Sequence, residues 1–241
     1  MSNRHGHSSV VHDGKIWVIG GAHDTAVSTI YMNSVHYSSN GESWTEATAS
    51  ANWTARHGHT SVVHDGKMWV IGGATGYMSY KNDVWHSPNG VNWTQATPSA
   101  NWSARLGHTS VVHGGKIWVI GGYDGTYKND VWYSSDGVQW TQASASAPWA
   151  ARYDHTSVVD DGKIWVIGGT SGFGAYENDV WCSSDGATWT QLTASASWSA
   201  RYGHTSVVHD GKIWVIEGDS RSEVWYSETL PPLSAANWWL Y

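Results

Sequence analysis

The chain has 241 residues, of which 40% are hydrophobic and 14% charged, with a formal net charge of -7. This length and composition suffice for one soluble domain with a substantial core. Lys and Arg are few and dispersed, which excludes a nucleic-acid surface, because phosphate binding needs clustered basic side chains. No apolar run approaches membrane-spanning length and no secretory signal is visible. We therefore expect no membrane contact and favour a cytoplasmic protein, although a trimmed secreted protein would look the same.

Five copies of one pattern run along the chain. Each copy begins Arg-x-x-His-(Ser/Thr)-Ser-Val-Val, passes through a glycine turn and continues Lys-(Ile/Met)-Trp-Val-Ile. The copies start at Arg4, Arg56, Arg105, Arg152 and Arg201, and subtracting neighbouring start positions gives spacings of 52, 49, 47 and 49 residues. Such a period is typical of solenoids and propellers. We predict one domain over residues 1–241.

The second copy shows how each repeat folds. His59–His64 is a β-branched run, and after an Asp-Gly turn Lys67–Ile71 completes a hairpin. A loop of variable length leads to Asp83–His86, and an Asn-Gly turn leads to Val91–Gln95. Turn pairs of this kind recur about every ten residues and leave no helical period between them. Each repeat is therefore predicted to be a four-stranded antiparallel meander.

The second strand of each repeat is apolar on both faces, so another sheet must cover it from each side. Blades stacked around an axis provide that cover, and we predict an all-β fold, a five-bladed β-propeller. The segment Ala235–Trp238 repeats the Ala-Asn-Trp of Ala51–Trp53, which leads into the next Arg-x-x-His. We therefore expect the chain to end where the first blade begins, so that the ring closes without strand exchange.

The repeat carries a Gly-Gly pair after the second strand and a Trp in the fourth. The pairs are Gly20-Gly21, Gly72-Gly73, Gly121-Gly122 and Gly168-Gly169, and the Trp residues are Trp44, Trp93, Trp140 and Trp189. In these motifs the chain resembles the kelch-repeat β-propeller family, which includes the kelch repeats of the galactose oxidase central domain. It departs from the family in blade number, because kelch propellers usually have six or seven blades, and at Glu217-Gly218, which replaces the last pair. Incomplete closure and a longer parent chain are the alternatives.

The candidate binding face is the side where the first strands begin and the second strands end, because the loops there vary in length and the opposite side carries tight turns. The resemblance to kelch domains implies recognition of peptides through Arg and Tyr on these loops. The Trp residues of the connectors between repeats would serve a glycan instead. The predicted ligand-binding residues are Arg56, Arg105, Arg152, Arg201, Trp53, Trp102, Trp149, Trp198, Tyr127, Tyr153, Tyr176 and Tyr202.

We predict a non-catalytic, monomeric binding propeller that holds a protein segment or a glycan on this face. The peptide version predicts acidic ligands, and the glycan version predicts several equivalent weak sites. Two alternatives stay open. One is a kelch-like sugar-processing enzyme similar to sialic-acid mutarotases, in which Arg would hold a carboxylate and a His or Glu would move a proton. The other is an engineered or recently amplified scaffold without a ligand.

The repeated polar residues do not indicate a catalytic or metal site. The recurrent acids occupy equivalent positions, so none is set apart as an acid or a base. The ring of histidines could ligate a metal only if several donors converged, which five separate blades seldom achieve. We expect each His and Arg to bond to loop backbone and to the acids instead, and we expect no cofactor. The histidines are His7, His59, His108, His155 and His204, and the acids are Asp83, Asp130 and Asp179. The lone Cys182 stands in a repeated Tyr position and does not suggest galactose-oxidase copper chemistry.

Overall fold

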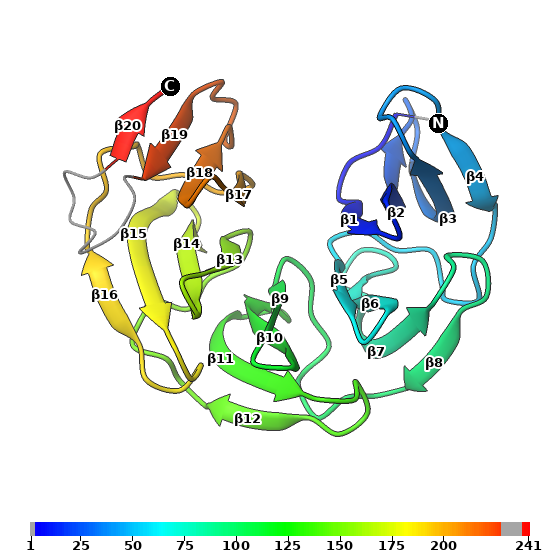
Figure 1. Ribbon diagram of the computed structural model, residues 1–241, viewed down its shortest axis with the longest axis horizontal. Coiled ribbons are helices and arrows are strands. Elements are labelled where there is room, and N and C mark those ends of the chain that lie inside the picture. Colours follow the sequence, from blue (N-terminus) through cyan, green and yellow to red (C-terminus); the bar gives the residue numbers. More distant parts are fainter. Residues whose placement is uncertain (1–2, 228–237) are drawn as a thin grey trace.

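The computed structural model describes residues 3–227 and 238–241, and their strands form five separate antiparallel sheets. Each sheet contains four strands in chain order, and Figure 1 shows the sheets arranged around a ring like the blades of a propeller. The fold is therefore the predicted five-bladed β-propeller, and every blade comes from one continuous stretch of chain without strand exchange. Within the described residues, no helix is long and apolar enough to cross a membrane.

Each blade runs from an inner strand beside the central axis to an outer strand at the rim (Figure 1). In chain order the strands are β1 (Ser8–His12), β2 (Lys15–Asp24), β3 (Thr29–Ser38), β4 (Thr45–Thr48), β5 (Thr60–His64), β6 (Lys67–Ala74), β7 (Tyr80–Ser87), β8 (Thr94–Thr97), β9 (Thr109–His113), β10 (Lys116–Tyr123), β11 (Tyr127–Ser134), β12 (Thr141–Ser144), β13 (Thr156–Asp160), β14 (Lys163–Gly172), β15 (Ala175–Ser183), β16 (Thr190–Thr193), β17 (Thr205–His209), β18 (Lys212–Ile216), β19 (Val224–Ser227) and β20 (Trp238–Leu240).

The middle strands are longer than the sequence predicted. In the second blade, β6 continues past Ile71 to Ala74, and β7 begins at Tyr80. The pairing register shifts between Ile71 and Gly73, so the Gly-Gly pair forms a bulge inside the strand instead of ending it. A Cβ on Gly73 would lie 2.7 Å from the Cβ of His59, which explains why this position is glycine.

The outer strands begin later than predicted. Strand β8 starts at Thr94, because the residues before it, 89–93, form a tight turn. The Asn89 side-chain oxygen accepts backbone N–H groups of Val91 and Asn92 at 3.0 Å each. The Trp93 indole donates to the Gly90 carbonyl at 3.1 Å, so Trp93 closes the turn just before the strand.

Across the described ranges the core consists of four apolar clusters, one between each pair of consecutive blades. Between the first two blades, Trp17 and Ile19 pack against Met68 and Val70. The Trp17 ring lies over Gly90, where a Cβ would come within 2.2 Å of it. The same arrangement recurs in the pairs Trp69 over Gly137 and Trp118 over Gly186. The Trp-rich repeat therefore builds the junction between blades.

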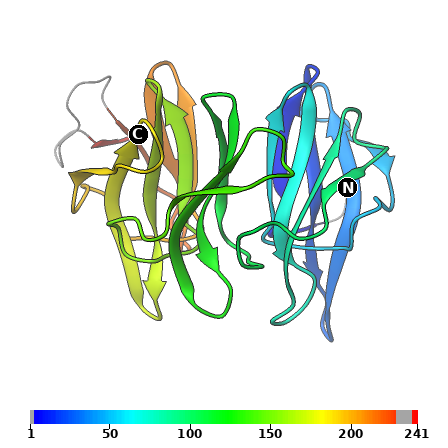
Figure 2. The ribbon, with the colours of Figure 1, turned by 90° about the horizontal axis from the view of Figure 1, so that it is seen from below.

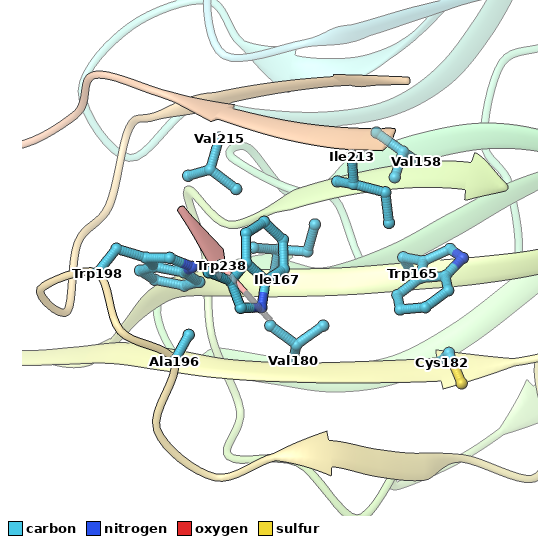
Figure 3. Close-up of a cluster of buried hydrophobic side chains, with 10 residues drawn as sticks. All are labelled: Val158, Trp165, Ile167, Val180, Cys182, Ala196, Trp198, Ile213, Val215 and Trp238. Atoms are coloured by element: carbon cyan, nitrogen blue, oxygen red, sulfur yellow. The ribbon is translucent and has the colours of Figure 1, made fainter. Parts of the chain in front are cut away.

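Trp238 shows where the sequence interpretation was wrong. It lies in β20, and its ring meets Trp198 edge to face with centroids 6.0 Å apart (Figure 3). The same edge-to-face contact joins a connector Trp to the Trp that comes just before the outer strand at the three preceding junctions: Trp53 to Trp93, Trp102 to Trp140 and Trp149 to Trp189. Trp238 is therefore the outer-strand Trp of the fifth blade, not a connector. The residues 235–237 used for that alignment lie outside the described residues.

The blades are joined in order by backbone hydrogen bonds around the axis. The Gly58 N–H donates to the Gly6 carbonyl at 2.8 Å, and the same bond links each blade to the one before it as far as Gly203. Among the described residues no such bond joins Gly203 to Gly6, and Figure 1 shows the blade of β17–β20 standing apart from the blade of β1–β4. The described residues therefore form a ring of five blades without a bond between the last blade and the first, and Trp238, on which the expected closure was based, is not a connector.

Candidate ligand-binding face

The predicted arginines are held inside the blades. Arg105 is fully buried and forms a bidentate ion pair with Asp130, at 2.6 and 2.8 Å. It also donates to the carbonyls of Gly121 and Ser103, at 2.8 and 2.9 Å. Burial by itself would raise the pKa of Asp130, but the hydrogen bonds and charge of Arg105 outweigh it and the pKa lies below its ordinary value. The donors of this guanidinium are therefore already used by the protein.

The same bidentate geometry recurs at Arg56 and Arg152, whereas Arg201 donates to its acid through Nη2 alone. The ion pairs are Arg56 with Asp83, Arg152 with Asp179 and Arg201 with Glu223. All four guanidinium groups have 0% exposed surface. The expected bonds between Arg, acid and loop backbone are confirmed. A ligand on the surface would not reach these side chains, so the geometry does not support their assignment as ligand contacts.

The four predicted connector Trp residues are also enclosed. Each is 1% exposed, and each packs its face near the guanidinium of the following Arg, with 5.7 to 6.0 Å from carbon to ring centre. Stacking of a sugar ring needs an open indole face, which none of them presents. The residues concerned are Trp53, Trp102, Trp149 and Trp198. They belong to the junctions between blades, and the repeated glycan sites expected from them have no exposed ring.

The predicted tyrosines, in contrast, lie at the surface and meet each other. Tyr127 and Tyr153 have ring centroids 5.7 Å apart, and both contact Tyr123, at 5.3 and 5.6 Å. Tyr80 extends the group through an edge-on contact with Tyr123 at 6.1 Å. We call Tyr80, Tyr123, Tyr127 and Tyr153 the tyrosine patch. All four rings are half-buried. Tyr176 and Tyr202 form a separate pair at 4.8 Å, across the next junction.

The repeat explains why these rings meet. One Tyr lies within the first three residues of the third strand of a blade, and the other residue follows the repeated Arg of the next blade, so that the two face each other across a junction. Tyr31 with His57, Tyr127 with Tyr153 and Tyr176 with Tyr202 are three versions of this contact. Tyr123 and Tyr80 were not in the predicted set. Their signal in the sequence was their position at the ends of the variable loops.

The axial channel opens on the same face. A cavity of about 170 Å³ is lined by Gly6, His7, Gly58, His59, Gly107, His108, Asp154, His155, Gly203 and His204. Asp154 stands where the other repeats have glycine, and it adopts their left-handed conformation with φ of 51°. Burial raises the pKa of its carboxyl to about 6. This acid breaks the symmetry of the channel mouth, and it was not among the predicted residues although it interrupts an Arg-x-Gly-His pattern.

The channel histidines bond to hydroxyl groups across the junctions, and the expected bonds to acids are not found for them among the described residues. His108 Nε2 lies 3.0 Å from the Thr60 hydroxyl of the preceding blade, which also contacts Ser110 Oγ at 2.6 Å. Burial and the charge of Arg105 lower the pKa of His108 to about 3, and burial and Arg201 do the same for His204. These imidazoles are therefore neutral at pH 7 and act as parts of the junction. The part of the chain that the structure describes contains no group of three or more His, Cys, Asp or Glu side chains placed to hold a metal ion.

Comparison with known proteins places this geometry in one family. The family model described as the KLHDC2/KLHL20/DRC7 Kelch-repeats domain matches residues 1–147 and again residues 89–231. A solved structure titled "Structure of YjhT" superposes with a TM-score of 0.81 at 16% identity, and the match covers 99% of this chain and 84% of that chain. No curated protein matches the sequence. The structural likeness, at this identity, concerns the fold.

Proposed function

This chain belongs to the kelch-repeat family, and on that premise we propose that it is a non-catalytic binding propeller that holds a protein segment across the tyrosine patch. The kelch propeller fold supports a binding or scaffold role in general terms. The observation that carries the finer proposal is the position of Tyr80, Tyr123, Tyr127 and Tyr153. Their half-buried rings touch one another on the loop face beside the axial channel.

Tyrosine suits protein recognition because a ring of limited flexibility offers apolar area together with a hydroxyl. The patch has few rotamers to lose, since each ring is already held by a neighbouring ring. It also spans the junctions on both sides of the third blade, from Tyr80 to Tyr153. An extended segment lying over several rings would use it better than a compact small molecule.

The charges beside the patch favour a neutral or basic segment over an acidic one. The arginines that would attract an acidic segment are buried in ion pairs. Asp124 is paired with Lys128 at 2.8 Å, whereas Asp154 lies beside Tyr153 in the channel mouth and its pKa is displaced by burial alone. A lysine or arginine of the bound segment would give Asp154 a partner and favour its ionised form.

A displayed library of random peptides, selected against the immobilised full chain, tests the proposal. Wild-type protein should enrich one family of neutral or basic sequences, and the double variant Tyr123→Ser/Tyr153→Ser should fail to retain them. Tyr77→Ser is the matched control, because Tyr77 lies on a loop of the same face, is 93% exposed and makes no ring contact with any residue that the structure describes. Selection of no common sequence, or equal binding by the patch variant, would refute the proposal.

One observation favours a second candidate, a sugar-processing enzyme of the kelch type. Asp154 is an acid with a pKa of about 6 at the channel mouth, close to neutrality and therefore suited to proton transfer. Nuclear magnetic resonance of anomer exchange in a panel of reducing sugars tests this candidate. Acceleration by the wild type that disappears in Asp154→Gly, which restores the residue of the other repeats, would favour the enzyme. Equal rates with and without protein would remove it.

A further inference from the structure

The faces of the first and last blades that turn toward the interruption of the ring are built like buried faces. On the last blade, Val207 is 44% exposed, whereas its equivalents Val62, Val111 and Val158 are 7% exposed each. On the first blade, Ile16 is 40% exposed, whereas Met68, Ile117 and Ile164 in the same position are fully buried. Two apolar faces that are covered at four junctions therefore face solvent at the fifth.

The polar links of the junction end at the same place. At each filled junction a Thr or Ser at the start of one inner strand meets a His and a Ser of the next blade, as Thr156 meets His204 and Ser206 at 3.0 and 2.6 Å. Thr205, the equivalent residue of the last blade, is exposed. In the described residues neither the Gly203 carbonyl nor the Gly6 N–H makes the inter-blade bond of its counterparts.

The second-strand Trp of the last blade, Trp214, also lacks the glycine contact that its equivalents make in other blades. Trp214 is half-buried and contacts Tyr226 and Tyr241 of its own blade. Its equivalents Trp17, Trp69 and Trp118 lie over a turn glycine of the following blade. The matching glycine of the first blade is Gly41, and a Cβ built on it would meet nothing within 4 Å. The two surfaces are complementary in sequence but do not touch.

We propose that this opening is a binding site for one further four-stranded blade of the same repeat. The argument is continuity with the established interface: the last blade offers the surface that receives a following blade, and the first blade offers the surface that receives a preceding one. Such an occupant would present a turn glycine to Trp214, a His and a Ser to Thr205, and its own Trp to Gly41.

The length of a similar solved structure agrees with an occupant of one blade. The match covers 99% of this chain and 84% of that chain, so about a sixth of that chain lies outside the match, which is the fraction that one blade makes of a six-bladed ring. In the side view of Figure 2 the first and last blades lie on opposite sides of the molecule. Both stand upright, in the same orientation as the blades between them. A blade would enter between them edge first, without altering the four filled junctions.

The direct experiment adds the blade to the full chain. A copy of residues 97–144, which contains the connector and third blade, is joined after Tyr241 in the register that Trp238 shares with Trp93. The extended chain should remain a monomer by light scattering, and its unfolding midpoint should rise by about 5 °C or more, because two interfaces are gained. The Gly6 amide should exchange with solvent as slowly as the Gly58 amide does.

Gly137→Asn within the added copy is the matched control. This turn glycine would receive Trp214, and a side chain there would block the ring, as the 2.2 Å approach at the native Gly137 shows. The control should lose most of the gain in midpoint. An unchanged midpoint and fast Gly6 exchange in the extended chain would overturn the proposal. So would a concentration-dependent dimer of the original chain that Gly41→Asn abolishes, because a second copy would then occupy the opening.

Discussion

The four filled junctions and the two open faces carry almost the same residues, yet one set is buried and the other is solvated. Trp17 and Ile19 are enclosed by the next blade, while Trp214 and Ile216 in the same positions are only half-buried. The repeat sequence therefore determines how one blade packs on the next, but it does not determine the number of blades. In repeat proteins stability comes from units and their nearest neighbours. The comparison predicts that equivalent substitutions have large effects at a filled junction and small ones at the open faces.

The largest difference should appear at the buried ion pairs. Arg105→Met leaves Asp130 buried without its partner and should lower the free energy of unfolding by about 3–5 kcal/mol. Arg4 belongs to the first blade, where Ser34 replaces the acid, and it donates to Gly20 O and Ser34 Oγ. Arg4→Met should therefore cost less than about 2 kcal/mol. Urea unfolding of both variants measures the difference, and equal losses would contradict the comparison.

A cavity in a filled junction should come next. Ile117 is fully buried against the second blade, so Ile117→Ala should cost about 2–5 kcal/mol. Ile16 is its equivalent on the open face of the first blade, and Ile16→Ala should cost less than about 1 kcal/mol. Thermal and urea unfolding give the two values. If Ile16→Ala proved as costly as Ile117→Ala, the face of the first blade would be covered in solution.

Substitution of a larger residue at two turn glycines tests the same difference between a filled junction and an open face. Gly41 and Gly137 have φ of 77° and 72°, so Asn imposes similar backbone strain at both. Only at Gly137 does a Trp ring occupy the space of the side chain. Gly137→Asn should therefore cost about 1–3 kcal/mol more than Gly41→Asn. Equal unfolding midpoints for the two variants would mean that Trp214 lies over Gly41, as in a closed ring.

Acid should weaken the filled junctions. The pKa of His108 is about 3 in the folded protein and its ordinary value is 6.5, so between these values the unfolded chain binds more protons and stability falls as the pH falls. Each such His contributes up to about 1.4 kcal/mol per pH unit, and His108→Gln should reduce the slope by that amount. His7 is exposed at the open face, so His7→Gln should change it less. Urea unfolding between pH 7 and pH 5 measures the slopes.

Asp154 acts in the opposite direction over part of this range. Its folded pKa of about 6 exceeds the ordinary 3.8, so the folded state binds more protons between these values and stability falls as the pH rises through them. The variant Asp154→Gly should therefore lose stability more steeply on acidification than the wild type does. An identical slope in the same urea experiments would show that this carboxyl is not shifted by burial.

The sequence predicted the blades well because their signals are local. Turn pairs such as Asp65-Gly66 set the hairpins, and apolar residues on both faces of β6 required covering sheets. Closure was beyond such signals. Trp53 and Trp93 each follow an Asn, so the sequence around Trp238 fits either position in the repeat. A match of three residues assigned Trp238 to the connectors, and only its contact with Trp198 shows that it belongs to the outer strand of the fifth blade.

Only part of the candidate site was predicted, because the sequence signals are local and do not show which side chains become buried. The motif located Arg105 and Tyr153 on one side of the propeller, but it did not show which would be enclosed. The pairing of Arg105 with Asp130, a residue of the third strand, buries the arginine, whereas the contact between Tyr153 and Tyr127 forms above the junction. Asp154 is a single-residue departure from the repeat, which has Gly at this position. Its importance follows only from its position in the channel mouth.

The distance between the first and last blades tests the central claim most directly. Spin labels at Ser39→Cys and His209→Cys would report it by double electron–electron resonance, with Cys182→Tyr removing the native thiol. The control pair is Pro88→Cys with His12→Cys, because His12 Nε2 lies 3.1 Å from the Pro88 carbonyl across a filled junction. We predict a clearly longer distance for the first pair than for the control. Equal distances would mean that the five blades close their own ring and that no site for a further blade exists.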